Sequence, residues 1–122
     1  MISAHIEVIL IVTGAATAIA LIQFIAPTSV LRVIYGVVPA ETVSIALARH
    51  WGLLIFLIGI LLIYAAFHPV VRDPAMVVAA VEKLALGAGV LGTSLRHRPI
   101  TTAIATGDSL IALVYLFYLM GF

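Results

Sequence analysis

Four long stretches of the chain are almost entirely apolar, and short polar segments separate them. Each stretch has about the 20 residues that an α-helix needs to cross the roughly 30 Å hydrocarbon core of a bilayer. The stretches predict helices over residues 6–26, 42–67, 74–93 and 101–120. Because the connecting segments are short, we expect an all-α integral membrane four-helix bundle with antiparallel neighbours, forming a single transmembrane domain over residues 1–122.

Two connecting segments carry signals for helix ends. Asp73 followed by Pro74 predicts the start of the third helix, because aspartate caps a helix and proline suits its first position. The connector over residues 28–38 is apolar, and Gly36 can end a short helix within it. This connector is either an interfacial helix with Arg32 at the headgroups or a re-entrant segment that lines the polar cluster described below.

The composition agrees with exposure to lipid. Of the 122 residues, 65% are hydrophobic and only 9% are charged, whereas soluble domains have about 25% charged residues. A net charge of +1 gives no electrostatic footprint for nucleic acid, and the absence of cysteine excludes disulfides and thiolate metal sites. Glu7 lies where a secretory signal would be basic, so we expect the first helix to be retained.

The basic residues of the connecting segments predict an orientation. Arg32 lies in the first segment and Arg96 and Arg98 lie in the third, whereas Arg72 in the second segment is offset by Asp73. The positive-inside rule therefore places the first and third segments in the cytoplasm and both termini outside.

Five ionisable residues stand inside the apolar stretches: Arg49, His50, Glu82, Lys83 and Asp108. A charge at the bilayer centre costs roughly 2.5–3.5 kcal/mol on insertion scales, so such side chains usually face other helices and pair with one another. The formal charges of the two cations and two carboxylates among them sum to zero, as buried pairing requires. We expect Arg49 to pair with Asp108, and His50 to be a second partner for Glu82 or Asp108.

Small residues predict which helix faces point inward. Arg49 shares a face with Gly52 and Gly59, and Glu82 lies on a stripe of small residues: Ala75, Ala79, Ala85, Gly89 and Gly92. Both charged residues are therefore expected inside the bundle. Lys83 lies about 100° around the helix from Glu82, and its long stem can carry the ammonium group either to an interface, where Glu7 is the expected contact, or to a neighbouring helix. The inward stripe of the last helix comprises Thr101, Ala105, Asp108, Ala112 and Tyr115.

The leading functional prediction is a pocket that binds the polar end of a lipophilic molecule. In its catalytic version His50 and Glu82 exchange a proton with the ligand, as in isomerisation of a lipid or isoprenoid-like molecule. Arg49 then stabilises an oxyanion and Asp108 holds Arg49. The candidate ligand contacts are Lys83, Trp51 and Tyr115.

Two further functions stay open, and the sequence does not decide whether the chain is an enzyme. One is a non-enzymatic membrane subunit or assembly factor whose buried ion pairs fix helix packing, and the other is proton-coupled transport. The expected partners are membrane lipids and either a second copy of the chain or another membrane protein. We expect no metal site, because there is no Glu-x-x-His motif and Arg49 beside His50 opposes a cation, and no nucleotide motif predicts a cofactor.

The ionisable positions also carry a resemblance. The segment Arg49-His50-Trp51-Gly52, the apolar run to Tyr64-Ala65-Ala66, the segment Val81-Glu82-Lys83-Leu84-Ala85 and the single Asp108 resemble a group of small bacterial membrane proteins that are distantly similar to DoxX-like four-helix proteins. The resemblance covers roughly residues 26–120. It implies a four-helix bundle of the bacterial inner membrane, with Arg49, His50, Glu82 and Asp108 as signature positions. It implies no particular reaction, because some DoxX-like proteins are linked to quinone-coupled oxidation and others serve as partners or assembly factors.

Overall fold

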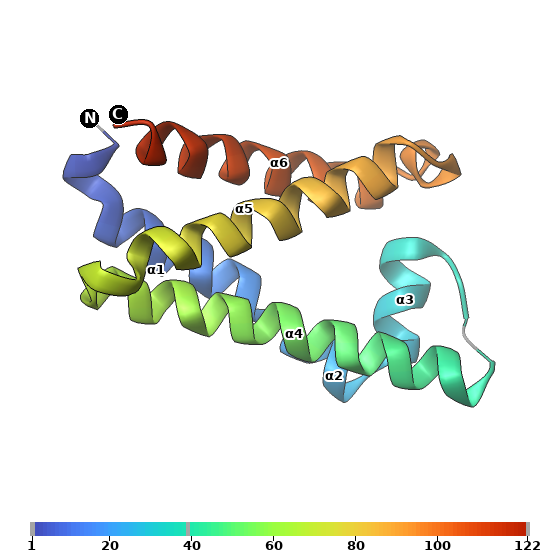
Figure 1. Cartoon of the computed structure of the whole chain (residues 1–122). Coiled ribbons are helices and arrows are strands. Elements are labelled where there is room, and N and C mark those ends of the chain that lie inside the picture. The colour runs from blue at the N-terminus through green and yellow to red at the C-terminus, as the bar shows by residue number, and fades with distance from the viewer. Residues whose placement is uncertain (1, 39, 122) are drawn as a thin grey trace.

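The computed structural model describes residues 2–38 and 40–121, and the regular elements in these ranges are all helical (Figure 1). They are η1 (Ser3–His5), α1 (Ile6–Ala18), α2 (Leu21–Ile25), α3 (Pro27–Tyr35), α4 (Thr42–Phe67), α5 (Pro69–Leu91), η2 (Ser94–His97) and α6 (Pro99–Leu119). Four spans, Ile6–Ile25, Thr42–Phe67, Pro69–Leu91 and Pro99–Leu119, are long and apolar enough to cross a membrane. The prediction of an all-α chain with four helices of spanning length is therefore confirmed.

The first span is broken, which the sequence did not predict. Between α1 and α2 the backbone tightens into i→i+3 hydrogen bonds, such as Ala20 to the Thr17 carbonyl (3.2 Å) and Gln23 to the Ala20 carbonyl (3.0 Å). The break packs against two glycines of α4. A Cβ at Gly59 would lie 2.5 Å from the Ala18 nitrogen, and one at Gly52 would lie 3.0 Å from the Ala20 carbonyl. Close backbone contact with α4 thus accompanies the change in helix direction.

The predicted start of the third helix at Pro74 is wrong, because α5 begins at Pro69 and continues through Pro74. Proline disrupts a helix mainly at the carbonyl four residues earlier. For Pro74 that residue is Val70, which lies in the first turn and is 91% exposed, so the disruption falls on the helix end. The ends of α5 at Leu91 and of α6 at Leu119, and the start of α6 at Pro99, differ from the predicted ends by one or two residues.

Arg72 lies in the first turn of α5 instead of a polar turn. Its side chain is buried and donates hydrogen bonds from Nε to the Ala65 carbonyl (3.2 Å) and from an η nitrogen to the Ala66 carbonyl (2.9 Å). These carbonyls belong to the last turn of α4, where carbonyls lack i→i+4 partners and Ala65 accepts only a longer bond from the His68 N–H (3.3 Å). Arg72 therefore caps α4 and fixes the turn between α4 and α5.

The bundle has a solid end and a hollow end. The buried core joins the start of α1, the end of α4, the start of α5 and the end of α6, around Leu10, Leu62, Met76, Ala112 and Tyr115. In Figure 1 this end carries both termini, and α3 lies at the opposite end. The cavity described in the next subsection lies toward α2 and α3. The outer surface is rich in exposed large apolar side chains, as a lipid-facing surface would be.

The connector helix α3 is fastened to α6. The Ile34 carbonyl near the end of α3 accepts a hydrogen bond from the Thr101 hydroxyl and one from Arg98 Nε (3.4 Å). Gly36 ends α3 with a φ of 71°, the left-handed conformation expected of a glycine there. Arg32 is exposed, but Val30, Ile34 and Tyr35 line the cavity. The connector therefore has one exposed face, which carries Arg32, and one face that lines the cavity beside the polar cluster.

Gly59 should be essential for the contact between α1 and α4. Gly59→Ala places a methyl group within 2.6 Å of backbone atoms of Gly14 and Ala18, so we expect it to destabilise the chain by about 1–3 kcal/mol. Gly107→Ala in α6 is the matched control, because nothing lies within 4 Å of its added Cβ. The measurement is the free energy of unfolding in mixed micelles, and equal values for the two variants would contradict the observed packing.

Candidate functional site

A cavity of about 340 Å³ lies inside the hollow end of the bundle. Its wall is mostly apolar, with a small number of polar side chains, which is the usual make-up of a site for a small molecule. Each of the six α-helices, α1 to α6, contributes to it. The lining residues are Ala16, Thr17, Ile19, Ala20, Ile22, Gln23, Val30, Ile34, Tyr35, Trp51, Ile55, Glu82, Lys83, Leu86, Ile104 and Asp108.

A buried ammonium group joins three helices at one side of the cavity. Lys83 Nζ in α5 lies 3.3 Å from Asp108 Oδ1 in α6 and donates a hydrogen bond to Thr17 Oγ1 in α1 (3.0 Å). The Lys83 side chain is 2% exposed and that of Asp108 is 22% exposed, so only the carboxylate reaches the cavity appreciably. The Thr17 hydroxyl donates in turn to the Thr13 carbonyl (2.7 Å). Lys83 therefore has its charge paired with Asp108 and two of its three donors directed at protein groups.

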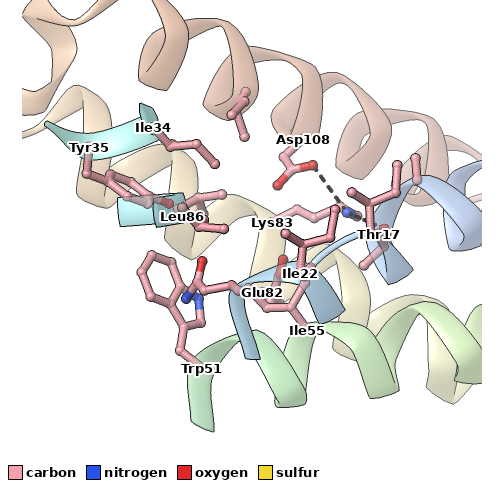
Figure 2. Close-up of a pocket in the computed structure, with 16 residues that line it drawn as sticks. Thr17, Ile22, Ile34, Tyr35, Trp51, Ile55, Glu82, Lys83, Leu86 and Asp108 are labelled. Carbon is pink, nitrogen blue, oxygen red and sulfur yellow. Dashed lines mark hydrogen bonds and ion pairs between the residues drawn. The ribbon is translucent and has the colours of Figure 1, made fainter. Parts of the chain in front are cut away.

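Glu82, the neighbour of Lys83, has no such partner. Its Oε2 atom is buried and makes no hydrogen bond among the residues that the structure describes, and the ion pair found there joins Lys83 to Asp108. A buried polar atom without a partner is unfavourable by roughly 1–3 kcal/mol, and more when it is charged. In Figure 2, Glu82 is drawn between the Lys83–Asp108 pair and the aromatic residues of the cavity. The carboxyl is thus positioned to meet a bound molecule.

Two aromatic side chains form the other side of the cavity. The rings of Tyr35 in α3 and Trp51 in α4 lie 5.4 Å apart between centroids, at an interplanar angle of 41°. Burial, together with the nearby carboxylates of Asp108 and Glu82, raises the pKa of the Tyr35 phenol to about 12. The hydroxyl therefore stays protonated at physiological pH and can donate a hydrogen bond.

Arg49 and His50 lie outside this site, so the expectation that Arg49 faces the interior and pairs with Asp108 is wrong. Both are exposed, and an η nitrogen of Arg49 donates to the Phe24 carbonyl at the end of α2 (3.0 Å). The inward face of α4 includes Ala48 and Gly52, and Ala48 is the residue directly before Arg49. A helix turns about 100° per residue, so this difference carries Arg49 to the surface. His50 is also not among the residues that line the cavity, and the expected pairing with Glu82 or Asp108 is not formed in the described structure.

Two other predictions for α5 and α6 need correction. Lys83 faces inward and Ala85, Gly89 and Gly92 are exposed, because the buried face of α5 includes Met76, Ala79, Ala80, Lys83, Gly87 and Val90. Of the two directions open to Lys83, the structure shows the one toward neighbouring helices, because Lys83 is bound to Asp108 and Thr17. The alternative contact with Glu7 is wrong, because Glu7 is exposed. Tyr115 is fully buried and hydrogen-bonded to the Thr13 hydroxyl, away from the cavity wall.

The cavity also includes residues that sequence reasoning missed. Gln23 is buried in α2 and donates to the Ala48 carbonyl (2.9 Å), while Thr17 binds Lys83 and Tyr35 faces the cavity. A signal was available for two of them, because Thr17 and Gln23 are rare polar residues in the first apolar stretch. Of the residues predicted for the site, the structure brings together Glu82, Lys83, Asp108 and Trp51.

Comparisons of the chain with protein-family models, with curated proteins and with solved structures gave no match. The resemblance to DoxX-like proteins therefore stays a prediction. Within the described residues, no three histidine, aspartate or glutamate side chains are grouped so that they could hold a metal ion.

Removal of Asp108 should be more damaging than removal of Lys83. Asp108→Asn leaves a nearly inaccessible ammonium without its counter-charge, so we expect a loss of about 3–5 kcal/mol in stability. Lys83→Met leaves a carboxylate that is partly exposed to the cavity and can be hydrated there, so its loss should be smaller. The combined variant should be more stable than Asp108→Asn alone. Unfolding in mixed micelles measures all three, with exposed Arg32→Gln as the control, and equal single losses would contradict the asymmetry.

Tyr35 should ionise late in an alkaline titration. Because its pKa is raised from 10.0 to about 12, its contribution to stability is complete below pH 10 and is lost as the pH rises toward 12. The ultraviolet difference spectrum of wild type minus Tyr35→Phe isolates this phenol. Appearance of the phenolate signal near pH 10 would contradict the described environment.

Proposed function

We propose that the chain is a multi-pass protein of the bacterial inner membrane that binds a small lipophilic molecule by its polar end. The four spans cross the membrane in alternate directions, with both termini outside. The observation that carries the binding proposal is the buried, unpartnered Glu82 Oε2 on an otherwise mostly apolar cavity wall. Apolar walls favour a lipophilic body, and the few polar groups orient its head.

The position of the cavity supports a ligand that comes from the membrane. Lys83 and Asp108 lie near the middles of α5 and α6, so the polar end of the ligand would sit at the depth of the hydrocarbon core. Broken helices at that depth are tolerated where they line a cavity, and the break between α1 and α2 lies at this wall. The volume of about 340 Å³ suits a small molecule of one short chain or a few rings.

The positions of the side chains change which residues could act as acid or base in a catalytic version of this proposal. Because His50 and Arg49 lie outside the cavity, they cannot serve as its acid, base or oxyanion donor. Glu82 is the candidate proton acceptor or donor, and the Tyr35 hydroxyl is the second group that can donate a proton or hydrogen bond to the ligand. Binding is the function that the cavity supports best, and proton transfer to the ligand depends on it.

The binding proposal predicts different effects for Glu82→Gln and His50→Ala. Purified in its native lipid, the wild-type chain should carry a specific non-lipid hydrophobic molecule, identifiable by mass spectrometry. Glu82→Gln should reduce its amount by on the order of tenfold, the equivalent of about 1.4 kcal/mol. His50→Ala should retain it, because His50 is exposed and outside the cavity.

The absence of any specific molecule from the wild type, or its equal retention in Glu82→Gln and His50→Ala, would contradict the proposal. A stoichiometric larger protein in place of a small molecule would favour the alternative of a membrane subunit or assembly factor.

A further inference from the structure

We propose that the head of the bound molecule is a cation, a protonated amine or a quaternary ammonium group. This inference rests on the proposed binding function and specifies its ligand. It follows from the charge of the cavity wall, from the occupied state of Lys83 and from the aromatic pair that shares the wall with Glu82.

The cavity wall carries more carboxyl groups than ammonium groups. Its ionisable side chains at neutral pH are Glu82, Asp108 and Lys83, two carboxyls against one ammonium. Lys83 is held by Asp108 at 3.3 Å and by Thr17 at 3.0 Å, which leaves Glu82 as the excess group. A ligand that supplies one positive charge would restore neutrality where the dielectric is low and unpaired charge is most unfavourable.

Other cations of the chain are directed elsewhere. Arg49 donates to the Phe24 carbonyl, Arg72 caps α4, and Arg98 donates to the Ile34 carbonyl. Arg32 and Arg96 are exposed. Among the described residues, none of these five guanidinium groups lines the cavity. The compensating charge for Glu82 is therefore not supplied by an arginine of this chain.

The aromatic pair favours a cation over a neutral donor. Tyr35 and Trp51 line the same cavity as Glu82, with ring centroids 5.4 Å apart. Electron-rich ring faces attract ammonium groups, more strongly when water is excluded, and aromatic residues with a carboxylate are a recurrent set for quaternary ammonium ligands. A hydroxyl head could accept the Tyr35 hydrogen bond but would gain little from the rings.

The test uses Trp51, the single tryptophan of the chain, as an intrinsic reporter on the cavity wall. The protein is held in uncharged dodecyl maltoside micelles and titrated with octyltrimethylammonium. The matched neutral probe has a carbon atom in place of the nitrogen, and octanoate is the anionic probe. Affinities are compared per mole fraction of probe in the micelle. We expect saturable quenching or shift of the Trp51 emission by the cation, with an affinity on the order of tenfold above that of the neutral probe.

Variants separate the contributions. Glu82→Gln should remove most of the preference for the cation, whereas Glu41→Gln, at an exposed position before α4, should keep it. Tyr35→Leu should weaken cation binding and Tyr35→Phe should largely preserve it, because phenylalanine retains a ring face. Circular dichroism establishes that each variant is folded.

Each outcome decides the proposal. Equal or stronger binding of the neutral or anionic probe, or an unchanged cation preference in Glu82→Gln, would overturn the cationic head and leave the binding function in place. If a two-chain phosphatidylethanolamine displaced the cationic probe, the proposal that the ligand is a small amphiphile would be overturned. If no probe of any charge gives a saturable change, the proposed binding function itself fails.

Discussion

The bundle depends on the burial of the Lys83 ammonium group near the middle of α5. A group of this kind is stable inside an apolar bundle only when a counter-charge and hydrogen-bond acceptors surround it. Asp108 supplies the charge from α6 and Thr17 supplies an acceptor from α1. Because the distances are 3.3 and 3.0 Å, three helices are held in one register at this level. Removal of Asp108 or Thr17 would leave the buried ammonium group without one of its two partners.

The two ends of the bundle differ on either side of the Lys83 level. On one side of the Lys83 level, small residues such as Ala65, Ala79 and Ala112 let the helices pack into a solid core. On the other side the first span bends at Ile19 and Ala20, and α2 and α3 surround a space instead of filling it. The hydrogen bond from Gln23 to α4 and those from α6 to the Ile34 carbonyl hold this open wall in place. Specific polar contacts therefore hold the helices that form the cavity wall.

Much of the fold and part of the site can be predicted from the sequence. The four apolar stretches indicate the spans. The scarcity of ionisable residues inside them selects five candidates, of which Glu82, Lys83 and Asp108 line the cavity. Periodicity alone does not predict whether Lys83 or Arg49 is the buried cation. A shift of one position turns a side chain by about 100° around the helix, and the long side chains of lysine and arginine can extend in several directions. Periodicity assigned Arg49 to a glycine face whose centre is Ala48 and Gly52. The break near Ile19 depends on contacts with Gly52 and Gly59 of a distant helix, so local sequence does not reveal it.

The buried cation is Lys83 and not the expected Arg49, and this difference changes how the role of Glu82 is interpreted. With Arg49 inside, the four charges would cancel, and packing alone would account for the whole cluster. With Arg49 bonded to the end of α2, Lys83 pairs with Asp108, and Glu82 forms no ion pair among the described residues. Packing at this position would be served as well by leucine or methionine, without an unpartnered buried polar atom. A carboxyl at such a position, next to an aromatic pair and an apolar cavity, is explained by a molecule that binds there.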